Sequence, residues 1–134
     1  LPYNLLDNEN LRGKSIELAR ARRKKIQVRS VFLQGLFFMD IERIPAGLSP
    51  LRDYLAQIKG ISKTYSVDLA SLALQYPIRN PKIDAVLIGC ETVAQVESNI
   101  GALKAKIPEG AWNEIEKINV AENLLLNPVN WPKS

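Results

Sequence analysis

Residues 83–99, IDAVLIGCETVAQVESN, join an apolar run to a helical pattern through Gly89 and Cys90. The run Ala85–Ile88 is apolar at every position, which is typical of a parallel strand covered on both faces. The apolar residues that follow are spaced like one face of a helix: Val93, Val96, Ile100 and Leu103. A strand ending in glycine at a helix N-terminus presents free backbone N–H groups, so the stretch predicts an anion-binding mouth. An ordinary helix cap without a ligand is the alternative interpretation.

The upstream residues predict a helix, a strand and a loop. Asp7 or Asn8 can cap a helix that runs to about Lys24. The segment Ile26–Val31 is short and rich in β-branched residues, which favours a strand. Residues 32–47 carry Gly, Pro and Asp without a regular period, so we expect a long structured loop there.

Two more helices are predicted before residue 83. Ser49-Pro50 is a typical helix start, and the apolar residues behind it recur at helical spacing: Leu51, Tyr54, Leu55, Ile58 and Ile61. Ser66 can cap a second helix over Val67–Gln75, which is apolar almost all round and should be buried. Pro77 is expected to break the chain after it.

A last helix is predicted over about Glu109–Asn119, and residues 119–134 look like an irregular tail. The order of strands and helices predicts βα units and a parallel α/β sheet. Only about three strands are present, whereas a (β/α)8 barrel takes about 250 residues. We therefore expect one partial domain over residues 1–134, the C-terminal part of a barrel and a fragment of a longer protein. Its exposed sheet edges predict self-association.

The composition excludes several kinds of chemistry. The sequence has no histidine, which excludes a triad with an imidazole base and a His-containing zinc site, and no metal site is predicted. Cys90 is the sole cysteine and is expected to be a small buried residue rather than a nucleophile. No apolar run is long enough for a membrane span, so a cytoplasmic protein is expected. The basic run Arg20–Lys25 is interpreted as a solvated helix end, not as a nucleic-acid or membrane surface.

Three segments, in order, resemble the C-terminal portion of the aldo-keto reductase family: PYNLLD (Pro2–Asp7), VRSVFLQGL (Val28–Leu36) and LASLALQYPIRNPKIDAVLIGCETVAQVESNI (Leu69–Ile100). They match the last three strand-helix units of that family's barrel. The resemblance implies an oxidoreductase that reduces small carbonyl substrates with NADPH or NADH. It also places the catalytic residues on the first four strands, so we predict that this chain alone is inactive.

The resemblance further implies which residues bind the cofactor. Gly89 through Asn99 would hold the adenosine end, with Thr92 and Gln95 near the ribose or its phosphate and Ser98 and Asn99 near the adenine. The residues after the preceding strand would line the pyrophosphate and the nicotinamide: Ser30, Phe32 and Gln34.

Two positions depart from the family pattern. Where the family commonly has a cation for the ribose phosphate, this sequence has Gln95 with Glu91 close by, and a carboxylate repels a 2′-phosphate. This favours NAD, or weak selectivity for NADP. Many members have an aromatic residue stacking on the nicotinamide where this sequence has Arg29, whose charge is unfavourable beside the oxidised ring.

The same departures motivate a second hypothesis from another class of protein. An altered cofactor clamp at Arg29 and Glu91 is also compatible with a non-catalytic aldo-keto-like domain that serves in binding or assembly. Cofactor affinity separates this hypothesis from the oxidoreductase.

Overall fold

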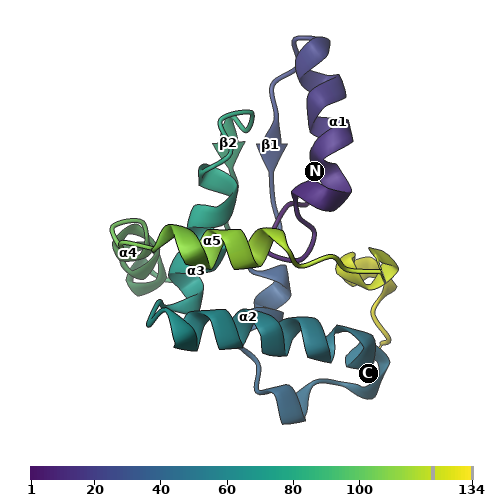
Figure 1. Ribbon diagram of the computed structural model, residues 1–134, viewed down its shortest axis with the longest axis vertical. Coiled ribbons are helices and arrows are strands. Elements are labelled where there is room, and N and C mark those ends of the chain that lie inside the picture. Colours follow the sequence, from purple (N-terminus) through teal and green to yellow (C-terminus); the bar gives the residue numbers. More distant parts are fainter. Residues whose placement is uncertain (122, 134) are drawn as a thin grey trace.

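The computed structural model describes residues 1–121 and 123–133, and Figure 1 shows how their elements are arranged. The α-helices of this part of the chain are α1 (Glu9–Ala21), α2 (Arg52–Thr64), α3 (Leu69–Ile78), α4 (Val93–Ala102) and α5 (Glu109–Glu116). The strands are β1 (Gln27–Val28) and β2 (Ala85–Val86). Short 3-10 helices fill the connections: η1 (Leu33–Phe38), η2 (Ile41–Arg43), η3 (Ala46–Leu51), η4 (Asn123–Leu126) and η5 (Pro128–Asn130). None of these described helices has the length and apolar character that a bilayer crossing requires.

The sheet is parallel, as predicted. The paired residues are Gln27 with Ala85 and Val28 with Val86. The N-terminal segment joins on the other side of β1 through a parallel bridge between Pro2 and Arg29. Strand positions that follow one another in the sequence therefore lie side by side, which is the usual result of βα connections.

Both strands are shorter than predicted. The predicted strand Ile26–Val31 ends early because Ser30 has a left-handed backbone, with φ 61°, and turns the chain away from the sheet. The predicted strand Ala85–Ile88 pairs over its first half only. The prediction that this strand is covered on both faces was wrong, because Leu87 is 53% exposed and Ile88 is 38% exposed.

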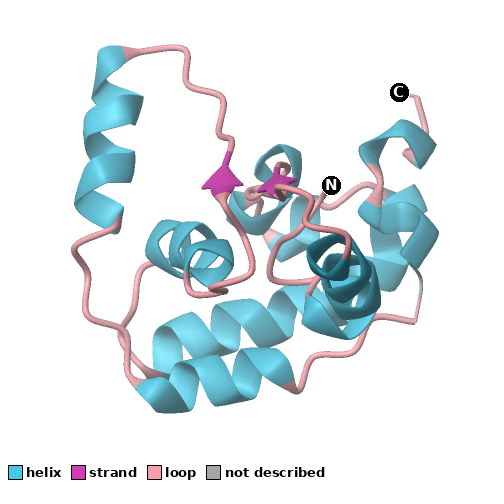
Figure 2. Cartoon of the chain, turned by 90° about the horizontal axis from the view of Figure 1, so that it is seen from above, coloured by secondary structure: helices cyan, strands magenta, loops and turns pink. Residues whose placement is uncertain are grey.

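The core lies between the sheet and the helices on one side of it. Leu55, Ile58 and Ile61 are the buried residues of α2, which confirms its predicted apolar face. Trp112 and Ile115 of α5 pack into the same cluster. Figure 2 shows β1 and β2 side by side, with α4 set apart at the edge of the view.

The helix starts follow local side-chain chemistry. Asn8 caps α1 by accepting from the backbone N–H of Asn10, as one of the two predicted caps. The predicted cap Ser66 was wrong: Asp68 caps α3 instead, and Ser66 has φ 52° in the turn before it. Pro77 lies in the last turn of α3, which ends one residue later at Ile78, so the predicted break in the chain falls just after Pro77.

Other boundaries also moved. The helix predicted from Ser49-Pro50 begins as the 3-10 turn η3 and becomes α-helical at Arg52. The last helix ends at Glu116, three positions before the predicted Asn119. The predicted irregular tail contains η4 and η5, while its residues 122 and 134 lie outside the described part of the chain.

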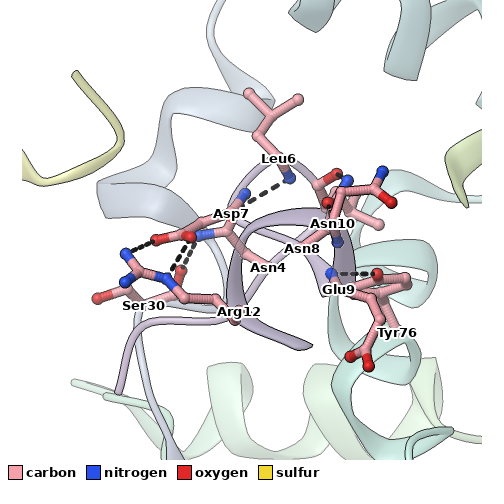
Figure 3. A network of polar contacts seen from close by, with 10 residues as sticks. Asn4, Leu6, Asp7, Asn8, Glu9, Asn10, Arg12, Ser30 and Tyr76 are labelled. Atoms are coloured by element: carbon pink, nitrogen blue, oxygen red, sulfur yellow. Dashed lines mark hydrogen bonds and ion pairs between the residues drawn. The ribbon is translucent and has the colours of Figure 1, made fainter. Parts of the chain in front are cut away.

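A buried polar network fixes the turn before α1 (Figure 3). The side-chain oxygen of Asn4 accepts from the backbone N–H groups of Leu6 and Asp7, at 3.0 and 2.9 Å. The Asp7 side chain is fully buried and pairs with the Arg12 guanidinium, whose Nη2 donates to Oδ2 at 2.7 Å. The Asn4 amide also donates to the carbonyl of Ser30 at 3.0 Å, which ties this turn to the loop after β1.

The apolar residues of α4 and of the end of β2 form an exposed surface, here called the α4 face. Its members are Ile88, Val93, Val96, Ile100 and Leu103, of which Val93 is the most open at 74%. The prediction that these apolar residues follow one face of a helix is thus confirmed. Among the described residues, no element covers this face.

Candidate cofactor site

Two cavities lie at the carboxyl ends of the paired strands. The first, called the α4 pocket, has a volume of about 580 Å³. Its lining residues are Phe32, Gln34, Gly35, Phe38, Ala70, Gly89, Glu91, Gln95, Ser98 and Asn99. The second, called the β1 pocket, has a volume of about 590 Å³. Its lining residues are Arg29, Ser30, Val31, Phe32, Leu33, Gln34, Gly35, Leu87, Ile88 and Gly89.

The two pockets share part of their lining, so they adjoin one another and are together called the trough. The shared residues are Phe32, Gln34, Gly35 and Gly89. A Cβ atom built on Gly89 would meet nothing within 4 Å, and the same holds for Gly35. Both glycines therefore keep the middle of the trough open. The trough lies where barrel proteins place their active sites.

The loop after β1 has an unusual backbone. Positive φ angles occur at Ser30 (61°), Leu33 (47°), Gln34 (54°) and Gly35 (79°). Non-glycine residues adopt this region rarely, and such positions cluster at functional sites. The loop predicted over residues 32–47 is structured, as expected, by the turns η1 and η2.

This backbone leaves donors without partners. The consecutive N–H groups of Ser30, Val31 and Phe32 donate to no acceptor among the described residues, whereas the next one, Leu33, donates to the Ser30 carbonyl at 3.1 Å. Neighbouring free N–H groups in a loop of mixed left- and right-handed residues form a concavity that suits an anion. The three residues line the β1 pocket, and donors without partners are the groups that a phosphate would require.

The N-terminus of α4 is occupied by its own side chains. Thr92 accepts from the backbone N–H of Gln95 at 3.1 Å, and Gln95 Oε1 accepts from the backbone N–H groups of Glu91 and Thr92 at 2.6 and 3.4 Å. This is a capping box. The expectation of free N–H groups at this helix was wrong for Glu91, Thr92 and Gln95. Thr92 is also the one predicted site residue that lines neither pocket.

The far wall of the α4 pocket carries polar side chains. Ser98 is exposed and Asn99 is half-buried. The Asn99 amide donates to the sulfur of Cys90 at 3.2 Å. Cys90 is exposed, so its predicted burial was wrong, because the residues after β2 lie on the α4 face rather than inside the core.

Arg29 stands at the end of β1 with little to neutralise it. Its side chain is exposed and lines the β1 pocket, where Nη1 donates to Ser30 Oγ at 3.1 Å. The ion pairs found among the described residues do not include it. Phe32, on the shared wall, stacks at an angle on Phe38 with ring centroids 5.6 Å apart. Phe38 is 48% exposed, so this ring contact lies at the surface.

Sequence reasoning missed several lining residues. Ala70 of α3 and Phe38 of η1 reach the α4 pocket from elements to which no role had been assigned. No motif surrounds either residue, so only the fold could identify them. Within the described residues, no group of three or more His, Cys, Asp or Glu side chains is placed to hold a metal ion.

A parallel sheet with helices packed on it and a trough at the strands' carboxyl ends defines an α/β protein of the barrel class. The model of the aldo/keto reductase family matches residues 1–120, and the chain belongs to this family. The predicted family and fold class are thereby confirmed.

Similar proteins include two dehydrogenases and one solved structure. Pyridoxal 4-dehydrogenase of Microbacterium luteolum is 27% identical over 123 residues, which cover 84% of this chain and 34% of the relative. D-threo-aldose 1-dehydrogenase of Pseudomonas sp is 31% identical over 65 residues, covering 48% of this chain and 20% of the relative. The chain therefore spans about a third or less of these relatives.

The aldo-keto reductase AKR11C1 from Bacillus halodurans, solved in a holo form, superimposes with a TM-score of 0.63. Its sequence identity is 22%, and the superposition covers 88% of this chain and 41% of that chain. This likeness concerns the fold.

Proposed function

We propose that this chain forms the cofactor clamp of an oxidoreductase that transfers hydride between a nicotinamide dinucleotide and a small carbonyl substrate. The observation that carries the proposal is the pair of adjoining pockets, because all the predicted site residues except Thr92 line one or both of them. A bound nicotinamide would supply the hydride. The residues of this chain would bind the dinucleotide and exclude water from it.

The two pockets suggest an orientation for the dinucleotide. The adenosine end would lie in the α4 pocket beside Ser98 and Asn99, and the pyrophosphate and nicotinamide would extend past Gln34 into the β1 pocket. The free N–H groups after β1 would donate to the phosphates. Gly89 allows close approach at the middle of the trough.

A preference for NAD over NADP is proposed from the residues that line the α4 pocket. Glu91 places a negative charge in the α4 pocket, and Gln95 already accepts the N–H groups that a 2′-phosphate would use. Substituting Glu91→Gln should raise affinity for NADPH relative to NADH by about fivefold, since it removes a repulsion near the surface. Competition titrations with both dinucleotides measure this ratio, and an unchanged ratio contradicts the assignment.

The substrate is proposed only as a class. The two curated relatives are named as dehydrogenases of pyridoxal and of an aldose, both small molecules that carry a carbonyl or hydroxyl group. The catalytic residues implied by the resemblance lie outside these 134 residues, so the chain alone should be inactive. Turnover by the purified 134-residue chain would contradict this.

The first experiment is a binding measurement on the full-length protein that carries this chain. Gly89→Val adds bulk to the shared wall at a position where a Cβ meets no atom within 4 Å, and it should weaken NADH binding at least about tenfold, or 1.4 kcal/mol. Gly60→Val is the matched control, because Gly60 also has open space around it and lies on α2, away from the trough. Equal binding by both variants and the parent protein would contradict the proposal.

One observation favours a second candidate function in assembly. An apolar groove of about 500 Å³ runs along the α4 face beside the unpaired edge of β2, lined by Leu74, Ile78, Val86, Val96, Ile100 and Leu103, among others. We propose that the 134-residue chain self-associates there. Sedimentation should show dimers or larger species that Ile100→Asp dissociates, and a monomeric parent chain would refute the proposal.

A reducing cytoplasmic setting is proposed as well, since it suits the exposed thiol of Cys90.

A further inference from the structure

The backbone of Arg29 is held by two hydrogen bonds to the N-terminal segment. Its backbone N–H donates to the Leu1 carbonyl at 3.0 Å, and its carbonyl accepts from the N–H of Tyr3 at 3.2 Å. The side chain is tethered in turn, because Nη1 donates to Ser30 Oγ at 3.1 Å. The Arg29 side chain lines the β1 pocket.

No carboxylate of the described residues balances this cation. The acidic groups that form ion pairs are Asp7, Glu17, Asp84 and Glu109, and each pairs with a different base. The acidic residue that lines the trough, Glu91, belongs to the α4 pocket and not to the β1 pocket. The two ends of the trough thus differ in charge, with Glu91 at one end and Arg29 at the other.

We infer that Arg29 makes the clamp bind the reduced, uncharged nicotinamide in preference to the oxidised, cationic one. The inference rests on the proposed function, which places the nicotinamide end of the dinucleotide in the β1 pocket. The diphosphate carries the same charge in NADH and NAD⁺, so attraction between it and Arg29 strengthens both forms alike. Only the oxidised ring carries a positive charge, so its repulsion from Arg29 weakens the binding of NAD⁺ and not of NADH.

Two other roles for Arg29 give different results. A guanidinium bound to the diphosphate would support both forms of the cofactor equally. A guanidinium that serves only to bind an acidic group of the carbonyl substrate would affect neither. The ratio of the two dissociation constants separates these roles from the inferred one, and it requires no catalytic turnover.

The experiment measures the Kd of NADH and of NAD⁺ on the full-length protein, by calorimetry and by NADH fluorescence. Arg29→Gln should lower the ratio of Kd for NAD⁺ to Kd for NADH by at least about fivefold, mainly through tighter NAD⁺ binding. Arg29→Lys should keep the parent ratio, because it keeps the charge. Arg22→Gln is the matched control, since it removes an exposed arginine at the end of α1 that forms no ion pair among the described residues.

The affinities of Arg29→Gln for the two cofactor forms distinguish the possible roles of Arg29. A parallel loss of both affinities in Arg29→Gln overturns the inference in favour of a diphosphate contact, and unchanged affinities overturn it in favour of a substrate role or none. Absence of binding of either form to the folded parent protein refutes the proposed function itself. Circular dichroism of each variant verifies that the fold is retained.

Discussion

The body built by α2, α3 and α5 and the α4 face use apolar residues at the same helical spacing, yet they end in opposite environments. Ile58 of α2 is 1% exposed, whereas Ile100 of α4 is 51% exposed. The residue type and its periodicity are equal in the two helices. What differs is the number of neighbouring elements, because α2 packs against α3, α5, η2 and η3, while α4 packs mainly against α3. Helical spacing predicts a face, and the surrounding elements decide whether that face is covered.

The largest expected effect comes from making the same substitution in both regions. Ile58→Ala should lower the free energy of unfolding by about 2 to 5 kcal/mol, because it leaves a cavity in a packed core. Ile100→Ala should change it by no more than about 0.5 kcal/mol in the 134-residue chain at concentrations low enough to keep it monomeric, since an exposed side chain leaves no cavity. Urea denaturation measures both values. Equal losses would contradict the contrast between the two regions.

A smaller effect is expected at the polar end of the body. Arg12→Ala leaves the buried Asp7 carboxylate without its partner, and it should cost about 2 to 3 kcal/mol of unfolding free energy. Arg12→Lys retains the charge but not the two-point contact, so it should recover part of the loss. Lys14→Ala, on an exposed position of the same helix, serves as the control. A loss no greater than that of the control would mean that the ion pair contributes nothing.

The capping box of α4 should contribute still less. Thr92→Ala removes the hydroxyl that accepts from the Gln95 backbone N–H, which typically costs about 1 kcal/mol. Hydrogen exchange should accelerate in the first turn of α4 and remain unchanged in α2. Acceleration in both helices would show that α4 unfolds together with the body rather than separately.

The smallest effect at neutral pH concerns Tyr3, next to the body's α3. Burial raises the pKa of this phenol above its ordinary value of 10, aided by the nearby Tyr76 and Glu9. A raised folded-state pKa favours the protonated form, so this contribution to stability is complete below pH 10 and declines as pH rises above it. Tyr3→Phe should flatten the pH dependence above pH 10 relative to the parent chain. Identical profiles would argue against a buried phenol.

The sequence could predict features that are determined locally, such as the Asn8 cap and the apolar face of α2. It could also predict the parallel pairing of β1 with β2, because the order of strands and helices implies it. The start of α3 was mispredicted because Ser66 and Asp68 are both good caps, and only the backbone of the preceding turn selects Asp68. Burial at the end of β2 was mispredicted because it depends on elements that the local pattern does not contain.

The candidate site divides in the same way. Gly89, Gln34 and Asn99 come together in one trough, as expected from their positions after two adjacent parallel strands. The self-capping of α4 by Gln95 was missed, although the spacing Thr92-x-x-Gln95 is itself a capping signature. The three free N–H groups after β1 could not be predicted, because they depend on the left-handed turn at Ser30.

The left-handed backbone at Leu33 and Gln34 also bears on how this protein can be engineered. Each residue holds a conformation that glycine adopts without steric cost, so Gln34→Gly should make the chain more stable, not less. The same substitution removes a side chain from the shared wall of both pockets. Thermal robustness and ligand recognition therefore compete for one position, and a consensus-style stabilisation campaign would have to leave this loop untouched.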